Sequence, residues 1–257
     1  MAFDSSNLGT KDHWKHVYDE EESAFDDAKV PGEVWFGERA AERHVRAVRD
    51  AIDAAAVDPA SLSAIDLGCG NGTLCIGLAL KEEHELDEGC LDACEATVGA
   101  AGVGRVVGID YVDSSVSLSQ KLLTAFTETH ADLAYLRERV SFAQADILEP
   151  TSFSQLGGPF QIVSDKGTYD AMSLSPDPLA AREGYRSTLL STLLAPTSPS
   201  LSLSLFVITS CNFTHDELAA FFTATGQLAV FRRIPAPSFT FGGVKGQQVS
   251  SIIFQRT

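Results

Sequence analysis

A glycine-rich octet, Ile65-Asp66-Leu67-Gly68-Cys69-Gly70-Asn71-Gly72, constrains the fold more than any other part of the chain. A short apolar run leads into an acid and then into three glycines at every second position. Glycine lacks a Cβ atom and adopts positive φ, so a strand that runs into such a turn lets the backbone approach a ligand closely. The octet predicts a buried strand, a ligand-binding turn and a helix start, although an ordinary strand-to-helix turn has a similar composition.

The spacing of this loop distinguishes two kinds of ligand. A dinucleotide-binding turn reads G-x-G-x-x-G and holds a pyrophosphate at a helix N-terminus. Here the pattern is D-x-G-x-G-x-G, with Asp66 two residues before Gly68. A carboxylate at this position repels pyrophosphate but suits a ligand that carries an ammonium and a sulfonium group. The loop therefore favours S-adenosylmethionine over a nicotinamide dinucleotide.

The remaining hydrophobic pattern predicts an α/β fold. Apolar runs of strand length alternate with stretches of helical periodicity. The predicted strands are 63–67, 106–110, 140–146, 160–164 and 201–209, and the predicted helices include 114–130, 185–194 and 215–225. This alternation indicates a mostly parallel sheet with helices on both faces. The last two predicted strands, Val230–Phe231 and Val249–Gln255, have no helix between them, so we expect an antiparallel pair at one edge.

The domain organisation follows from length and local composition. A chain of 257 residues suits one large α/β domain, so we expect a single domain over residues 1–257. The polar residues 1–12 are expected to form a mobile tail, and the long segment 81–104 is expected to be partly helix and partly a surface insertion. The apolar runs are too short for a bilayer span, and no signal-peptide pattern precedes them, so a cytosolic monomer is expected.

Charge and cysteine content narrow the possible partners. The chain has 19 Lys and Arg residues against 35 Asp and Glu residues, a formal net charge of −16. Such acidity disfavours nucleic-acid binding and suits a cationic partner, such as a lysine-rich protein surface, although it also serves solubility. The five cysteines are expected to be free thiols. Cys90 and Cys94 have no second Cys or His pair at zinc-like spacing, so no metal site is expected.

Four predicted strands end in carboxylates, at Asp66, Asp110, Asp146 and Asp165. Ligands bind beyond the carboxyl ends of the strands in open α/β sheets, so these acids are expected to gather around one site. Asp110 is expected to accept hydrogen bonds from both ribose hydroxyls of an adenosine group.

The two acids Asp110 and Asp146 have neighbours that suit an adenine base. Tyr111 is expected to pack beside the ring, with surface exposure as the alternative. Asp146 supplies an acceptor for the adenine amino group, and Ile147 supplies an apolar wall next to it.

The hexapeptide Asp165-Lys166-Gly167-Thr168-Tyr169-Asp170 is expected to face the methyl group. Methyl transfer to an amine is an in-line displacement whose rate depends on alignment and on the exclusion of water. The unperturbed pKa of a lysine is about 10.4, and a neighbouring carboxylate raises it further. We therefore interpret Asp165 as a group that positions an incoming ammonium rather than as a strong base, and we expect Lys166 to pair with a nearby acid.

Several sequence blocks occur together in a recognisable order. They are Glu33–Gly37, the loop Asp66–Gly72, Val107–Tyr111, the block DKGTYDAMSLSPD at 165–177, ITSCNFT at 208–214 and FTFGG at 239–243. From about His13 to Gln255 the chain resembles the seven-strand, S-adenosylmethionine-dependent methyltransferases that methylate lysine on eukaryotic translation elongation factor 1-alpha. The resemblance implies a Rossmann-like seven-strand sheet, S-adenosylmethionine as cofactor and this elongation factor as the protein substrate.

The resemblance also implies roles for individual residues. Trp35 and Phe36 would close the pocket from the N-terminal side, and Asp165 and Tyr169 would face the target lysine as the catalytic pair. The expected cofactor-binding residues are Trp35, Asp66, Gly68, Gly70, Gly72, Asp110, Tyr111, Asp146 and Ile147.

Three other functions remain open at this stage. The same fold serves methyltransferases that act on another protein or on a small molecule, and the 165–177 block is the feature against them. A nicotinamide dehydrogenase uses a similar sheet, but the glycine spacing disfavours it. A catalytically silent scaffold is disfavoured by the intact glycines together with Asp110 and Asp165.

Overall fold

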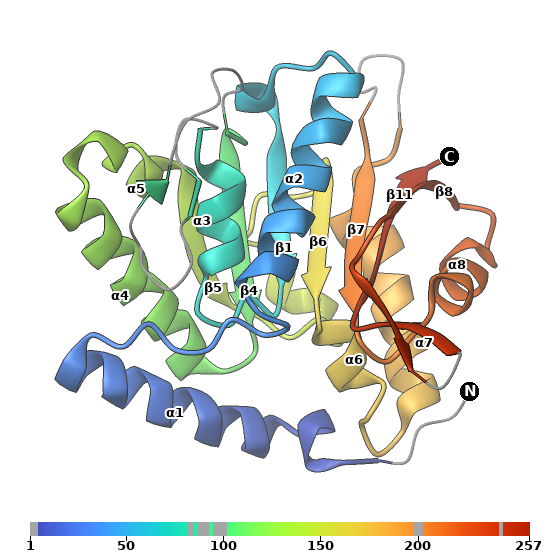
Figure 1. Cartoon of the computed structure of the whole chain (residues 1–257), viewed down its shortest axis with the longest axis horizontal. Helices are drawn as coiled ribbons and strands as arrows, with labels where there is room; N and C mark the ends of the chain where they lie inside the picture. The colour runs from blue at the N-terminus through green and yellow to red at the C-terminus, as the bar shows by residue number, and fades with distance from the viewer. Residues whose placement is uncertain (1–4, 82–84, 87–92, 95–101, 198–202, 242–243) are drawn as a thin grey trace.

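A computed structural model of the chain describes residues 5–81, 85–86, 93–94, 102–197, 203–241 and 244–257. Its centre is a seven-stranded sheet in the order β5-β4-β1-β6-β7-β11-β8 (Figure 1). The strands are β1 (Ser63–Leu67), β4 (Arg105–Asp110), β5 (Val140–Gln144), β6 (Ile162–Lys166), β7 (Leu205–Ser210), β8 (Leu228–Ile234) and β11 (Ser250–Arg256). Two short antiparallel pairs lie outside this sheet, β2 (Glu85–Leu86) with β3 (Ala93–Cys94) and β9 (Ser238–Phe241) with β10 (Val244–Gln247).

The strand directions confirm the predicted mixed sheet. Strands β5, β4, β1, β6 and β7 are parallel to one another, whereas β11 is antiparallel to both β7 and β8. The predicted antiparallel pairing of the last two long strands is therefore present. Strand β11 lies between β7 and β8, so β8 forms the edge of the sheet.

Helices cover both faces of the sheet. The α-helices are α1 (Lys11–Ala28), α2 (Glu38–Ala54), α3 (Thr73–Ala79), α4 (Asp113–Thr129), α5 (Leu136–Arg139), α6 (Thr168–Met172), α7 (Pro178–Thr188) and α8 (His215–Thr223). Short 3₁₀ helices lie at Asn7–Gly9, Pro59–Ser61, Ala131–Leu133 and Pro150–Phe153, and a π-helical turn at Leu189–Leu193 continues α7.

Two apolar clusters lie on opposite faces of the sheet. One joins α2, α3 and α4 to the sheet through side chains such as Val48, Leu78 and Phe126. The other joins α7 and α8 to the opposite face through Tyr185 and Phe222, among others. Because both faces are covered, the central strands are buried along most of their length, and all six residues of β7 are buried.

The start of α7 differs from the sequence prediction, which placed a helix over 185–194. The helix begins at Pro178, where the side chain of Asp177 accepts a hydrogen bond from the backbone N–H of Ala180. Proline at the first helical position and an acidic N-cap form a standard helix start, and this signal precedes the apolar residues that the periodicity detected.

From residue 5 on, the N-terminal segment is more structured than the mobile tail predicted over 1–12, and residues 1–4 lie outside the described residues. Residues Asn7–Gly9 form a 3₁₀ helix, α1 begins at Lys11, and the backbone N–H of Ser6 donates to Leu174 O at 3.0 Å. A Cβ atom on Gly9 would lie 2.2 Å from the carbonyl of Leu174, so the two backbones are in direct contact. Glycine permits this approach because it has no side chain.

Helix α1 lies across the carboxyl ends of the central strands and packs against α4 (Figure 1). Its buried Trp14, Tyr18 and Phe25 meet Leu118 and Leu122 of α4.

An ion-pair cluster reinforces the contact between α1 and α4. The ammonium group of Lys121 contacts Glu22 at 2.8 Å and Asp26 at 2.6 Å. Most of the predicted insertion at 81–104 lies outside the described residues. In the described part of the chain, no helix has the length and apolar character that crossing a bilayer requires.

The aromatic cluster beneath α8 is expected to carry much of the stability of this face. Phe222 is fully buried and its ring centroid lies 4.9 Å from that of Phe206 and 5.5 Å from that of Phe254. Replacing it with alanine should lower the free energy of unfolding by about 3–5 kcal/mol, measured by chemical denaturation. The matched control is Phe231→Ala, because that ring is 41% exposed and its loss should cost far less. Equal losses in the two variants would contradict the assignment.

Candidate active site

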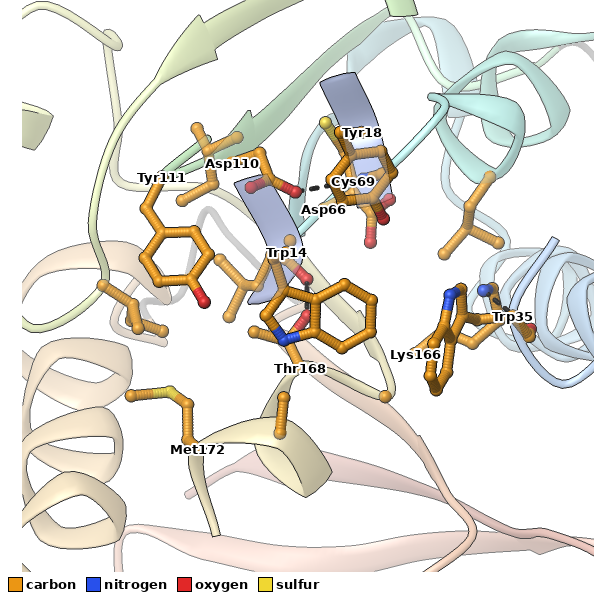
Figure 2. A pocket seen from close by; sticks show the side chains of 18 of the residues that line it. Trp14, Tyr18, Trp35, Asp66, Cys69, Asp110, Tyr111, Lys166, Thr168 and Met172 are labelled. Atoms are coloured by element: carbon orange, nitrogen blue, oxygen red, sulfur yellow. Dashed lines mark hydrogen bonds between the residues drawn. The ribbon is translucent and has the colours of Figure 1, made fainter. Parts of the chain in front are cut away.

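One large cavity lies beyond the carboxyl ends of β1, β4 and β6, under helix α1 (Figure 2). Its empty volume is about 1220 Å³, including the open mouth. The lining includes Asp66, Gly68 and Gly70 from β1 and its loop. It also includes Asp110 and Tyr111 at the end of β4, and Asp146 and Ile147 after β5. Of the expected cofactor-binding residues only Gly72 does not line it, so the structure brings the other eight together, Trp35 included.

The glycine loop has positive φ at Gly68 (65°), Gly70 (56°) and Gly72 (80°). A Cβ atom on Gly68 would lie 2.1 Å from Thr168 Oγ1, and one on Gly70 would lie 2.7 Å from the hydroxyl of Tyr18. The first two glycines are therefore required both by backbone conformation and by close contacts at the cavity wall.

Gly72 has a different place from the one expected of a cofactor-binding residue. It is the N-cap of α3, and a Cβ atom there would lie 2.7 Å from the ring of Phe142. Since it lies outside the cavity lining, Gly72 shapes the loop and the packing beneath it.

Asp110 fixes the loop from the end of β4. Its carboxylate accepts hydrogen bonds from the backbone N–H of Gly70 at 3.3 Å and of Val112 at 3.0 Å. The hydroxyls of Ser115 and Ser119 donate to the carbonyl of Gly70 at 2.8 and 2.7 Å. Burial raises the pKa of Asp110, while the backbone N–H groups that bind its carboxylate act in the opposite direction.

Tyr111 and Asp146, the two residues that the sequence analysis assigned to adenine, both line the cavity. The ring of Tyr111 is half-buried, and the ammonium of Lys11 lies 5.3 Å from its centroid. Asp146 Oδ1 accepts a hydrogen bond from the backbone N–H of Leu148 at 2.9 Å, which fixes the direction of the carboxylate. Ile147 is buried beside them, as expected of an apolar wall.

The other side of the cavity contains Asp66 and Lys166 beneath the segment 31–37. Lys166 Nζ donates to the carbonyl of Trp35 at 3.0 Å, and Asn71 Nδ2 donates to the carbonyl of Pro31 at 3.2 Å. Burial raises the pKa of Asp66 to about 7, and the charge of Lys166 acts in the opposite direction. The segment is thus bound both to the glycine loop and to the end of β6.

An aromatic roof, which we define as Trp14, Tyr18 and Trp35, lies over the cavity. The ring centroids of Trp14 and Trp35 are 4.7 Å apart at an interplanar angle of 64°, and Trp14 Nε1 donates to Leu8 O at 2.7 Å. Trp35 is in the predicted place, but sequence reasoning did not assign Trp14 or Tyr18 to the site. Their spacing of four residues puts them on one face of a helix, which is the signal that marks them as a pair.

Two residues of the connection between α1 and α2 have left-handed backbone. Lys29 and Phe36 have positive φ, at 57° and 66°, although neither is glycine. Lys29 is the C-cap of α1 and its backbone N–H donates to Phe25 O, a common way for a helix to end. Phe36 has a bulky side chain, so its left-handed backbone is strained.

Asp165 and Tyr169 do not line the cavity, in contrast to the prediction that both face a target lysine. The carboxylate of Asp165 is completely buried and accepts hydrogen bonds from the backbone N–H groups of Thr168 (3.1 Å) and Tyr169 (3.0 Å) and from the hydroxyl of Tyr185 (2.7 Å). Successive side chains of a strand point to opposite faces, so Asp165 points toward α7 while Lys166 lies in the cavity wall.

Tyr169 belongs to the aromatic cluster on the α7 and α8 face. Its ring centroid lies 5.1 Å from those of Phe213 and Phe222, and its hydroxyl accepts a hydrogen bond from Arg182 Nε at 2.7 Å. The cavity is lined instead by the next residues of the turn, Gly167 and Thr168. The role of Asp165 in this geometry is to cap and orient that turn.

Removing the hydroxyl that binds Asp165 should destabilise the fold in a pH-dependent way. Burial raises the pKa of Asp165 to about 8. In an unfolded chain it is about 3.9, so its contribution to stability falls as the pH rises between these values. The Tyr185→Phe variant should lose about 1–3 kcal/mol of unfolding free energy, and more at about pH 9 than at about pH 6, because the ionised carboxylate loses a donor. Denaturation at both pH values measures this.

The control for this variant is Tyr135→Phe. The Tyr135 hydroxyl accepts a hydrogen bond from the backbone N–H of Lys81, and among the described residues no carboxylate is bound to it. Its loss should be equal at the two pH values. A Tyr185→Phe loss that is also independent of pH would contradict the assigned role of Asp165.

Comparison with known proteins identifies the family to which the chain belongs. Residues 59–229 match a family model described as "Methyltransferase domain". The chain is 34% identical to protein-lysine N-methyltransferase efm4 of Schizosaccharomyces pombe, over 97% of this chain and 94% of that protein. It is 32% identical to EEF1A lysine methyltransferase 2 of Mus musculus, over 99% of this chain and 86% of that protein.

Among solved structures, the chain is similar in fold to magnesium protoporphyrin IX methyltransferase from Synechocystis PCC 6803 with bound SAH. The TM-score is 0.56 at 16% identity, over 96% of this chain and 97% of that one. The predicted Rossmann-like methyltransferase fold is confirmed. The chain belongs to the family of protein-lysine N-methyltransferases that includes efm4 and EEF1A lysine methyltransferase 2.

Proposed function

We propose that the chain transfers a methyl group from S-adenosylmethionine to the side chain of a lysine in elongation factor 1-alpha (EEF1A). The observation that carries the proposal is the similarity of the chain, over 99% of its length, to EEF1A lysine methyltransferase 2 of Mus musculus, a methyltransferase named for this substrate. The 165–177 block supports the same substrate class, and it forms the turn at the cavity wall.

The residues present fit the proposed cofactor. Gly68 and Gly70 expose bare main chain where any Cβ atom would meet Thr168 or Tyr18. Asp110, held at this loop, is placed to accept hydrogen bonds from ribose hydroxyls, and Tyr111 and Ile147 supply surfaces for a base. The bound cofactor supplies an electrophilic methyl group on a sulfonium cation, and the carboxylates of the cavity favour that positive charge.

The acidic cavity also bears on the dehydrogenase alternative. The cavity lining includes the carboxylates of Asp66, Asp110 and Asp146. A pyrophosphate placed against the glycine loop would be close to Asp66 and Asp110, which oppose its charge. The geometry therefore favours a sulfonium ligand over a dinucleotide.

The aromatic roof excludes water from the cavity, and the 167–168 turn orients its wall. Trp14 and Trp35 exclude water from the space beneath them, and removal from water lowers the pKa of an entering lysine. Asp165 caps the turn at 167–168, and Thr168 Oγ1 of this turn donates to Leu67 O at the end of β1 at 2.5 Å. These bonds fix the part of the cavity wall that an entering lysine would contact. We therefore assign Asp165 and Tyr169 to the support of this wall.

A class I methyltransferase acting on another protein or on a small molecule is the second candidate. The open mouth of the cavity is the observation that permits it. Incubation of the chain with S-adenosylmethionine and purified EEF1A, followed by mass spectrometry of the peptides, tests the two. A lysine that gains one or more methyl groups supports the proposal, whereas an unmodified elongation factor overturns it.

The cytosolic location and the monomeric state expected from the sequence stay predictions.

Substitution of Gly68 should strongly weaken cofactor binding. Gly68→Ala places a Cβ atom against Thr168 at a backbone with φ of 65°, so the cavity wall must shift. The affinity for S-adenosylhomocysteine, measured by calorimetry, should fall by about 100-fold or more. The matched control is Gly226→Ala, where φ is 72° but no atom lies within 4 Å of the added Cβ. Wild-type affinity in Gly68→Ala would mean that the ligand does not use this loop.

Added salt should weaken the binding of the protein substrate. The net charge of −16 attracts a basic partner, and added salt screens that attraction over distances of about 10 Å and more. The KM for EEF1A should rise with ionic strength while the affinity for S-adenosylhomocysteine changes much less. A KM that does not depend on salt would leave solubility as the role of the acidic surface.

A further inference from the structure

A single cation stands among acids in the cavity wall. Of the described residues that line the cavity, Lys166 is the only lysine, arginine or histidine. The acids of the lining are Glu33, Asp66, Asp110 and Asp146. The methionine part of the proposed cofactor carries both an ammonium and a carboxylate group. The carboxylate needs a positive partner in this acidic cavity, because the other charged side chains of the described wall repel it.

The strand register places Lys166 and Asp66 on the same side of the sheet. Asp66 of β1 pairs with Ser164 of β6, and Lys166 follows Ser164 by two residues. Residues two apart on a strand point to the same face. Ser164 faces α2, where its hydroxyl contacts His44 Nε2 at 3.2 Å. The acid and the cation thus lie on adjacent strands and on one face.

Figure 2 shows Lys166 at the side of the cavity away from Tyr111, with Asp66 between them. Lys166 and Trp35 lie at one side of the view, and Tyr111 lies at the other, with Trp14 between them. A ligand whose base rests near Tyr111 and whose sulfur passes the glycine loop therefore brings its amino-acid end toward Asp66 and Lys166.

The ammonium of Lys166 has more N–H donors than its bond to Trp35 O uses. A lysine ammonium has three N–H groups, and Trp35 O accepts one of them. In the described part of the chain Nζ forms no ion pair; burial lowers the pKa of Lys166, and the charges of Asp66 and Asp165 act in the opposite direction. Its environment is otherwise apolar on the roof side, with the ring centroid of Phe36 at 5.9 Å. A buried cation in this situation is stabilised by an anionic ligand.

We propose that Lys166 binds the carboxylate of the methionine part of the cofactor, with Asp66 binding the ammonium beside it. Through its bond to the carbonyl of Trp35, Lys166 also connects the occupied cavity to the roof. This inference rests on the proposed function, since it assumes S-adenosylmethionine as the cofactor. It requires no particular protein substrate.

The test compares two ligands that differ only in the carboxylate. S-adenosylhomocysteine has it, and its decarboxylated analogue, S-adenosyl-3-thiopropylamine, does not. Calorimetry should show that the wild-type chain prefers S-adenosylhomocysteine by about 10- to 100-fold, the range of a charged hydrogen bond. The Lys166→Met variant should bind the two ligands about equally, and Lys166→Arg should keep a preference for the carboxylate because it keeps the charge.

Two control variants separate this contact from other effects. Asp66→Asn should weaken both ligands by a similar factor, because both carry the ammonium group. Lys81→Met removes one positive charge from a residue outside the cavity lining and should leave both affinities unchanged. Thermal unfolding of each variant checks that the fold is retained.

The outcomes distinguish the inference from the function on which it rests. If Lys166→Met weakens both ligands equally, Lys166 acts only by holding Trp35, and the inference is overturned. It is also overturned if Lys166→Met binds S-adenosylhomocysteine as the wild type does. If the wild-type chain fails to bind S-adenosylhomocysteine at all, the proposed function itself is wrong.

Discussion

The contact between the carboxylate of Asp110 and the backbone of Gly70 holds the whole site together. It joins the ends of two neighbouring strands, and the carbonyl of the same glycine is bound by Ser115 and Ser119 of α4. The turn can therefore keep its left-handed conformation while presenting bare main chain to a ligand. Helix α1 then rests on this turn, because the hydroxyl of Tyr18 occupies the space where Gly70 lacks a side chain.

The charges of the cavity follow from the same arrangement. Burial of Asp66 and Asp110 beside the glycines of the loop creates a place that favours a cation and disfavours phosphate. The one basic side chain among the described lining residues, Lys166, lies at the side away from Tyr111. S-adenosylmethionine has a sulfonium cation at its centre, and an ammonium and a carboxylate at its methionine end. The order of these charges matches the order of the charged side chains in the cavity.

The sequence predicted the sheet and most of the cavity, because both depend on local signals. Strand β1 has the predicted bounds, and Asp110 lies at the end of its strand as expected. The orientation of Asp165 depends on a one-residue alternation, and sequence alone did not show which face of β6 meets the cavity. The roof depends on the packing of α1 against α4, a contact between distant parts of the chain that hydrophobic periodicity does not report.

The connection between α1 and α2 carries Trp35 and is anchored at two points. Its carbonyls at Pro31 and Trp35 accept hydrogen bonds from Asn71 of the glycine loop and from Lys166 of β6. The position of Trp35 over the cavity therefore depends on the same two elements that form the cavity wall beneath it. A substitution in either element changes the shape of the roof as well as the shape of the wall.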